Sequence, residues 1–255
     1  MKNLILLIFF AFIISSCATR KQIVYLQDVD NQTLVDIREL SKHPIIQTND
    51  ILDIKVGAIN PSSVAHFNRN PGENNNAPQR LELLRLTGYV VDEEGNIDFP
   101  QLGKIHVGGK TTVEAQELMK LLLSKEVINP NVKLTIINNK FTVHGEVARP
   151  GTYEFIEENL TLPQALGMAG DLTITGRREN VLLIRHNPNG EREVKRIDLT
   201  SSEWMNTDAY FIRQNDWIYV EPNQPKVKSA GFVGNVGTVS TVISIILTAV
   251  VLITR

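Results

Sequence analysis

The sequence predicts an α+β protein that ends in a single transmembrane helix. Short apolar strands alternate with short capped helices through the middle of the chain, and an uncharged segment closes it. The 22 residues from Phe232 to Ile253 include no Asp, Glu, Lys or Arg. A helix of that length reaches about 33 Å, which is enough for the hydrocarbon core of a bilayer. We therefore expect residues 231–255 to form one membrane helix.

One face of this helix differs from the others. Small and hydroxylated residues recur at a spacing of three and four, which places them on one side of a helix. They are Gly234, Gly237, Thr241, Ser244 and Thr248. Such residues let helices approach closely, and in a ring they can also face water. Two interpretations are open: the stripe faces a lumen or a neighbouring helix, or the helix is a lone anchor whose Ser and Thr side chains bond to their own backbone.

The start of the chain predicts export and lipid attachment. Lys2 precedes an apolar run, residues 4–14, that is too short to span a bilayer. Small residues then precede Cys17, which resembles the lipobox of bacterial lipoproteins. Cys17 is the only cysteine, so no intrachain disulfide competes for its thiol. We expect residues 1–16 to be a lipoprotein signal peptide and Cys17 to be lipidated; the alternative is an ordinary secretory leader with a chance cysteine.

The net charge and the residues after Cys17 limit the possible partners and cellular location of the protein. A net charge of −2 without a basic cluster argues against a nucleic-acid partner. No acidic residue directly follows Cys17, which in bacterial lipoproteins is typical of the outer membrane. Residues 17–44 and 223–230 are predicted to be linkers, the first of them lipidated.

Between these linkers the pattern predicts short strands and two capped helices. One helix begins at Thr111 with Glu114 completing a capping box, and the other begins at Thr161 with Gln164. Residues 60–78 are predicted to be a loop with little core. Trp217 lies within a predicted strand, so we expect it to belong to the core or to an interface rather than to stack on a sugar. The predicted strands are 51–56, 87–91 and 96–99 (as a hairpin), 132–136, 141–147, 180–185 and 193–197 (as a hairpin), and 216–220.

No motif predicts catalysis. The run Gly109-Lys110-Thr111 resembles the end of a phosphate-binding loop, but the glycine that this loop needs is replaced by Lys104. The acidic residues 92–94 are predicted to be a solvated turn, and the histidine spacing supports no zinc site. We therefore expect no catalytic residue, no metal and no cofactor. A glycan-processing enzyme is the alternative, because composition alone does not exclude a carboxylate pair.

The ordered motifs resemble the bacterial polysaccharide export family. The first blocks are Asn49-Asp50-Ile51-Leu52-Asp53-Ile54, residues 88–108, and Thr111-Thr112-Val113-Glu114-Ala115. Further blocks, Val143-His144-Gly145-Glu146-Val147, residues 149–153 and residues 216–222, resemble the sugar-interacting β-grasp module of that family, the SLBB domain. The resemblance implies a polysaccharide export domain at 45–139 and one β-grasp-like SLBB domain at 140–222.

The resemblance also implies a function. Members form an outer-membrane translocon, a homo-oligomeric and porin-like ring that exports capsular polysaccharide or exopolysaccharide without catalysis. The lipid anchor would lie in the outer membrane, the main body in the periplasm, and the partner would be an inner-membrane polysaccharide copolymerase of the tyrosine-kinase type. The best-known members have more than one SLBB module, whereas one is found here. The alternative is a lipid-anchored periplasmic scaffold that does not itself form the pore.

Overall fold

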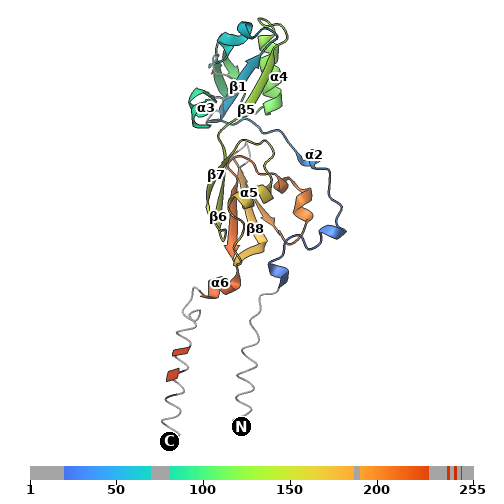
Figure 1. Cartoon of the computed structure of the whole chain (residues 1–255), viewed down its shortest axis with the longest axis vertical. Helices are drawn as coiled ribbons and strands as arrows, with labels where there is room; N and C mark the ends of the chain where they lie inside the picture. Colours follow the sequence, from blue (N-terminus) through green and yellow to red (C-terminus); the bar gives the residue numbers. More distant parts are fainter. Residues whose placement is uncertain are drawn as a thin grey trace.

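The computed structural model describes residues 20–69, 81–186 and 190–229, together with Ser240, Thr241, Ser244, Ile245 and Thr248. Two domains that mix helix and sheet are stacked along the long axis, each with its own hydrophobic core (Figure 1). The α+β prediction is therefore confirmed for the body of the chain. The elements η1 (Arg20–Gln22) and α6 (Gln224–Ser229) lie near each other, at the end of the second domain that points away from the first.

The first domain is built around β1 (Ile51–Gly57). This strand pairs antiparallel with β2 (Tyr89–Val90) on one side and with β5 (Asn131–Ile136) on the other. A separate hairpin joins β3 (Asn96–Phe99) to β4 (Gly103–His106). Every second side chain of β1 is buried, as alternation along a half-buried strand requires. These side chains are Leu52, Ile54 and Val56.

Helix α4 (Thr112–Leu123) begins where the capping box predicts. The Thr111 hydroxyl accepts a hydrogen bond from the Glu114 amide at 3.2 Å, and the Glu114 carboxylate accepts one from the Thr111 amide at 2.8 Å. The helix packs against β5 through one buried face. That face consists of Ala115, Met119 and Leu123.

Two local predictions for this domain are wrong. Strands 87–91 and 96–99 do not form a hairpin with each other: β2 pairs with β1, and β3 pairs with β4. The turn glycine that closes the true hairpin is Gly103, whose φ of +68° suits a residue without a side chain. The predicted loop 60–78 also contributes to the core, because η3 (Pro61–Phe67) buries Val64 and Phe67; residues 70–80 lie outside the described part.

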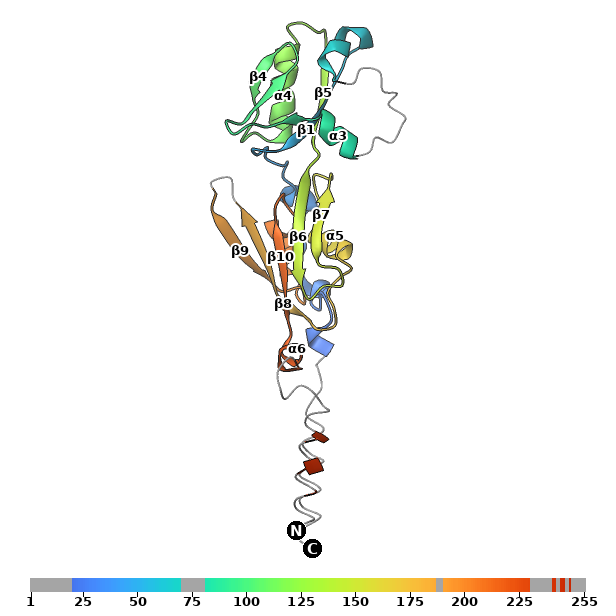
Figure 2. The ribbon, with the colours of Figure 1, turned by 90° about the vertical axis from the view of Figure 1, so that its left-hand side faces the viewer.

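The second domain holds a five-stranded sheet in the order β7-β6-β10-β8-β9. Strand β10 (Trp217–Pro222) lies in the centre, parallel to β6 and antiparallel to β8. The capped helix α5 (Leu162–Met168) begins at Thr161 as predicted and packs over one face of the sheet (Figure 2). The other strands are β6 (Asn139–Gly145), β7 (Gly151–Phe155), β8 (Gly176–His186) and β9 (Arg192–Ile197).

The opposite face of this sheet is open, so Trp217 does not lie in the core, and the expectation of an interface stays a prediction. Alternation along β10 buries Ile218 and Val220 and turns Trp217 and Tyr219 to the other side. Trp217 is 41% exposed, and the His144 ring packs against it edge-on with 5.9 Å between centroids. In contrast, Trp204 in η4 (Glu203–Asn206) is buried in the core.

Residues 20–44 form a strap across the second domain rather than a simple linker (Figure 1). The backbone amides of Leu26 and Gln27 donate to the carbonyls of Leu199 and Thr200 at 3.1 and 2.7 Å. The side chains of Tyr25 and Leu26 pack against the second core. The strap then passes through the short helix α2 (Ile37–Leu40) and enters the first domain. The chain therefore contacts its second domain before it builds the first.

The C-terminal segment is described only at five positions. Ser240, Thr241, Ser244, Ile245 and Thr248 are helical and exposed, and the rest of 231–255 lies outside the described residues. No helix among the residues that the structure describes is both long enough and apolar enough to cross a bilayer. The predicted linker 223–230 contains the short helix α6.

The buried face of α4 supports a stability prediction for the first domain. Met119→Ala should lower the free energy of unfolding of this domain by about 2–5 kcal/mol, because it leaves a cavity among residues that cannot close it. Leu121→Ala, on the exposed side of the same helix, should change it by less than about 0.5 kcal/mol. Hydrogen exchange of α4 peptides in urea measures both effects. Equal protection in the two variants would contradict the assigned core.

Candidate functional site

Only some of the predicted site residues lie in the part of the chain that the structure describes. Cys17, Gly234 and Gly237 lie outside the described residues. Thr241, Ser244 and Thr248 are helical and exposed, and the Thr248 hydroxyl donates to the Ser244 carbonyl at 2.7 Å. This bond satisfies the hydroxyl within its own helix. The role of the stripe therefore stays a prediction.

The motifs that we set aside have structural roles in the described chain. Thr111, at the end of the apparent phosphate-binding motif, caps α4. Asp92, in the acidic turn, accepts from the amides of Glu94 and Asn96 at 3.0 and 2.7 Å, and these bonds hold the pKa of its carboxyl below the ordinary value. Within the described ranges, no group of three His, Cys, Asp or Glu side chains could hold a metal ion.

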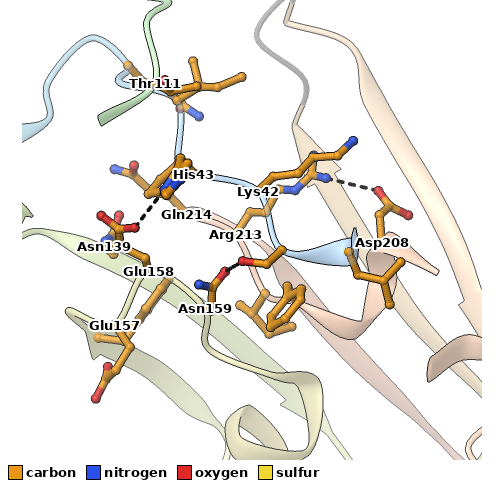
Figure 3. Close-up of a pocket in the computed structure, with 18 of the residues that line it drawn as sticks. Lys42, His43, Thr111, Asn139, Glu157, Glu158, Asn159, Asp208, Arg213 and Gln214 are labelled. Carbon is orange, nitrogen blue, oxygen red and sulfur yellow. Dashed lines mark hydrogen bonds and ion pairs between the residues drawn. The ribbon is translucent and has the colours of Figure 1, made fainter. Parts of the chain in front are cut away.

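A cleft of about 480 Å³ lies where the two domains meet. Most of its walls come from four stretches that are distant in the sequence: the end of the strap, the start of α4, the segment after β7, and the segment before β10. Asn139 of β6 and His186 of β8 complete the lining. Figure 3 shows their polar side chains converging on the cleft. Among the lining residues are Ser41, His43, Thr111, Glu157, Glu158, Asn159, Asp208, Phe211, Arg213 and Gln214.

Glu158 connects three parts of the chain across this cleft. Its carboxylate lies 3.2 Å from His43 Nδ1 on the strap (Figure 3) and accepts from the Thr112 hydroxyl of α4 at 3.3 Å. Beside it, the Ser41 hydroxyl donates to the Asn159 side chain at 2.9 Å. The strongest polar groups of the cleft are thus already paired with one another.

A buried carboxylate joins the domains next to this cleft. Asp50, just before β1, is fully buried and accepts from the Gln47 amide at 2.8 Å and from Gln214 Nε2 at 2.7 Å. Burial raises the pKa of Asp50, and the two hydrogen bonds oppose that shift. An ion pair between Arg85 and Glu154, at 2.9 Å, joins the domains at another position. The cleft is therefore part of a hydrogen-bonded junction.

The second-domain wall of the cleft rests on a buried ion network. Arg185, on β8, is 1% exposed and donates to both carboxylate oxygens of Asp216, at 3.0 and 2.7 Å, and to the Phe211 carbonyl at 2.7 Å. Burial raises the pKa of Asp216, whereas the bonds from Arg185 favour its charged form. The Arg213 amide also donates to Asp216 at 2.8 Å. These bonds fix the segment 208–216, which carries the lining residues.

Asp208 forms ion pairs with the positively charged side chains of this network. Its carboxylate contacts Lys195, Arg185 and Arg213, the last two at 3.3 Å. Figure 3 shows the contact with Arg213. Partial burial works against the charged form, but the three cations together hold the pKa of Asp208 below its ordinary value. The network is structural, because Asp216 is closed off from solvent.

The polar side chains of the cleft bond one another across the junction, as the contacts of Glu158 with His43 and Thr112 show. Sequence reasoning missed this site because its residues come from separate stretches. One signal was available: Arg185 and Asp216 are charged residues at the ends of two apolar runs, and two such residues on adjacent strands are candidates for a buried pair.

Comparison with known families decides what these domains are. Residues 39–137 match the model of the polysaccharide biosynthesis/export protein family, and residues 140–195 match the SLBB domain model. The two models together cover more than half of the chain and follow each other in order. The chain belongs to the polysaccharide export family. Its first domain is the export domain, and its second is an SLBB domain whose sheet is completed by β10, beyond the matched residues.

Two curated relatives are both named as polysaccharide export outer membrane proteins. The EPS I polysaccharide export outer membrane protein EpsA of Ralstonia solanacearum is 29% identical over 143 residues, which is 54% of this chain and 37% of that protein. EpsA of Ralstonia nicotianae is 34% identical over 104 residues, 39% of this chain and 27% of the relative. The similarity thus spans well under half the length of these relatives.

Removing the arginine of the buried pair should strongly destabilise the SLBB domain. Arg185→Met leaves Asp216 buried without its cation and should lower the free energy of unfolding by about 3–5 kcal/mol, whereas Arg185→Met/Asp216→Leu should recover part of that loss. Arg177→Met, at an exposed pair on the same strand, should cost less than about 1 kcal/mol. Tryptophan fluorescence follows this domain selectively, because both tryptophans of the chain lie in it. A double variant as unstable as the single one would contradict this account.

The low pKa of Asp208 gives a pH dependence with a defined sign. A carboxyl whose pKa is lower in the folded state stabilises the protein above its unfolded value of 3.8, and that contribution disappears as the pH falls through the folded value. Asp208→Asn should therefore lower the urea midpoint at pH 7, and the difference from wild type should shrink as the pH falls below about 4. A difference that stays constant from pH 7 to pH 3 would contradict the ion network as its source.

Proposed function

We propose that this chain is a subunit of an outer-membrane translocon that exports capsular polysaccharide or exopolysaccharide. The ordered export and SLBB domains support this proposal, as do relatives that are named as polysaccharide export outer membrane proteins. The subunit acts as a non-catalytic part of a conduit, and its substrate is the transported polysaccharide. The cleft serves to hold the export and SLBB domains together rather than to perform a reaction.

The observation that carries the membrane part of the proposal is the position of the first and last described elements of the body. The first and last elements of the body, η1 and α6, lie at the same end of the SLBB domain. A lipid on Cys17 and an apolar helix over residues 231–255 would then attach the body to one membrane from one side. The export domain, at the other end, would point into the periplasm toward an inner-membrane copolymerase of the tyrosine-kinase type.

In the proposed ring, the C-terminal helices form a barrel through the outer membrane. The stripe Gly234, Gly237, Thr241, Ser244 and Thr248 would face the lumen or a neighbouring helix, and the aliphatic residues would face lipid. A scaffold without a pore is the second candidate. It is favoured by the bond from Thr248 to the Ser244 backbone, since a hydroxyl satisfied within its own helix needs neither water nor a partner.

The mass of the full-length, acylated protein in mild detergent tests the ring. We expect one discrete large oligomer, which Cys17→Ser or truncation from Phe232 onward weakens or abolishes, because each removes one attachment. A monomer in several gentle detergents would exclude the conduit and leave the scaffold. Turnover of purified polysaccharide that one carboxylate substitution abolishes would instead indicate a glycan-processing enzyme.

A further inference from the structure

The open face of the SLBB sheet presents an apolar row that nothing in the described chain covers. Trp217 on β10 stands opposite Ile184 on β8, which in turn stands opposite Val194 on β9. Trp217 and Val194 are 41% and 55% exposed, and neither α5 nor the strap lies on this side (Figure 2). Three large apolar side chains in register on neighbouring strands form a flat surface suited to protein contact.

A second apolar surface lies on the strap, on the other side of the same domain. The strap packs inward through Tyr25 and Leu26, and it leaves a run of aliphatic side chains turned outward. They are Val29, Leu34, Val35 and Ile37, each between 37% and 49% exposed. Figure 1 places the strap on one side of the domain and β6 and β7 on the other, and Figure 2 shows the strap behind the sheet. One molecule therefore cannot close these two surfaces on each other.

The charges around the two surfaces are opposite in sign. On β9, Arg192 and Arg196 flank Val194, and both are exposed. On the strap, the exposed acidic residues Asp30, Asp36 and Glu39 surround the aliphatic run, with Arg38 paired to Asp36. A basic rim facing an acidic rim favours contact between the two surfaces and disfavours contact of either surface with itself.

We propose that the outer side of the strap of one copy docks on the open SLBB sheet face of the next copy. Unlike patches on opposite sides of one subunit make a head-to-tail contact, and such a contact closes into a ring when the rotation per subunit allows it. This inference rests on the proposed function, because it names the subunit contact of the proposed ring. It assigns the strap a second role besides linking the anchor to the body.

Substitution of the central tryptophan tests the sheet surface. Trp217→Glu and, on the strap, Val35→Glu should each weaken assembly about tenfold or more in dilution series. Each substitution would place a charge where the proposed contact buries an apolar side chain. Ile59→Glu, at a residue 84% exposed in the export domain, is the matched control and should leave assembly unchanged. Tryptophan fluorescence from Trp204 and circular dichroism confirm that the variants fold. Full assembly of Trp217→Glu together with loss of polysaccharide transport would overturn docking and indicate a sugar contact.

A photo-crosslinking side chain at position 194 of the full-length protein tests the partner surface. We expect a ladder of dimers and larger species, with the crosslinked peptide of the second copy lying within residues 28–40. Crosslinks from Val194 to the sheet face of the second copy, or to another segment of an intact oligomer, would overturn the docking inference but leave the ring standing. A monomeric wild-type protein in the mass measurement would remove the proposed function itself, so the two failures are distinguishable.

Discussion

The ion pair between Arg185 and Asp216 is the interaction on which the junction of the domains depends. Arg185 lies near the end of β8 and Asp216 just before β10, so the pair fixes the chain where it turns into the central strand of the sheet. The same guanidinium bonds the Phe211 carbonyl and the backbone of Asp208. The segment that carries Gln214 is thereby held in place, and Gln214 in turn reaches the buried carboxylate of Asp50. The buried ion pair of the second domain therefore also positions the side chain that bonds the first domain.

A buried charge pair contributes little net stability, because desolvation offsets the Coulomb attraction, but a broken pair is costly. Such a pair therefore acts chiefly on specificity. With Asp216 occupied by Arg185 and by the Arg213 amide, few other arrangements of residues 208–216 satisfy all the buried groups. The cleft keeps a defined shape for this reason, even though its walls come from separate parts of the sequence.

Local sequence signals predicted the elements of this fold well and their pairing less well. The capping boxes at Thr111 and Thr161 mark the helix starts correctly, because both partners lie within one turn. The hairpin of β8 and β9 also follows from its turn.

The predicted hairpin at 87–99 was wrong because β2 pairs with β1, a strand more than thirty residues earlier, which no local pattern specifies. The pattern left open whether Trp217 lies in the core or at an interface, since alternation gives the two faces of a strand but not which of them is covered. The strap looked like a linker because its partners, near Leu199 and Thr200, are distant in the sequence.

The position of the strap also determines how the molecule bears force. A pull between the two ends of the chain enters through residues 20–28, which are bonded to the SLBB domain at Leu199 to Ser202, and leaves through α6, which follows directly on β10. The path of tension therefore runs through the SLBB domain alone. The export domain lies outside that path. The chain segments that join it to the SLBB domain carry no load while the hydrogen bonds of the strap hold. The fold thus shields its far domain from strain applied at the near end.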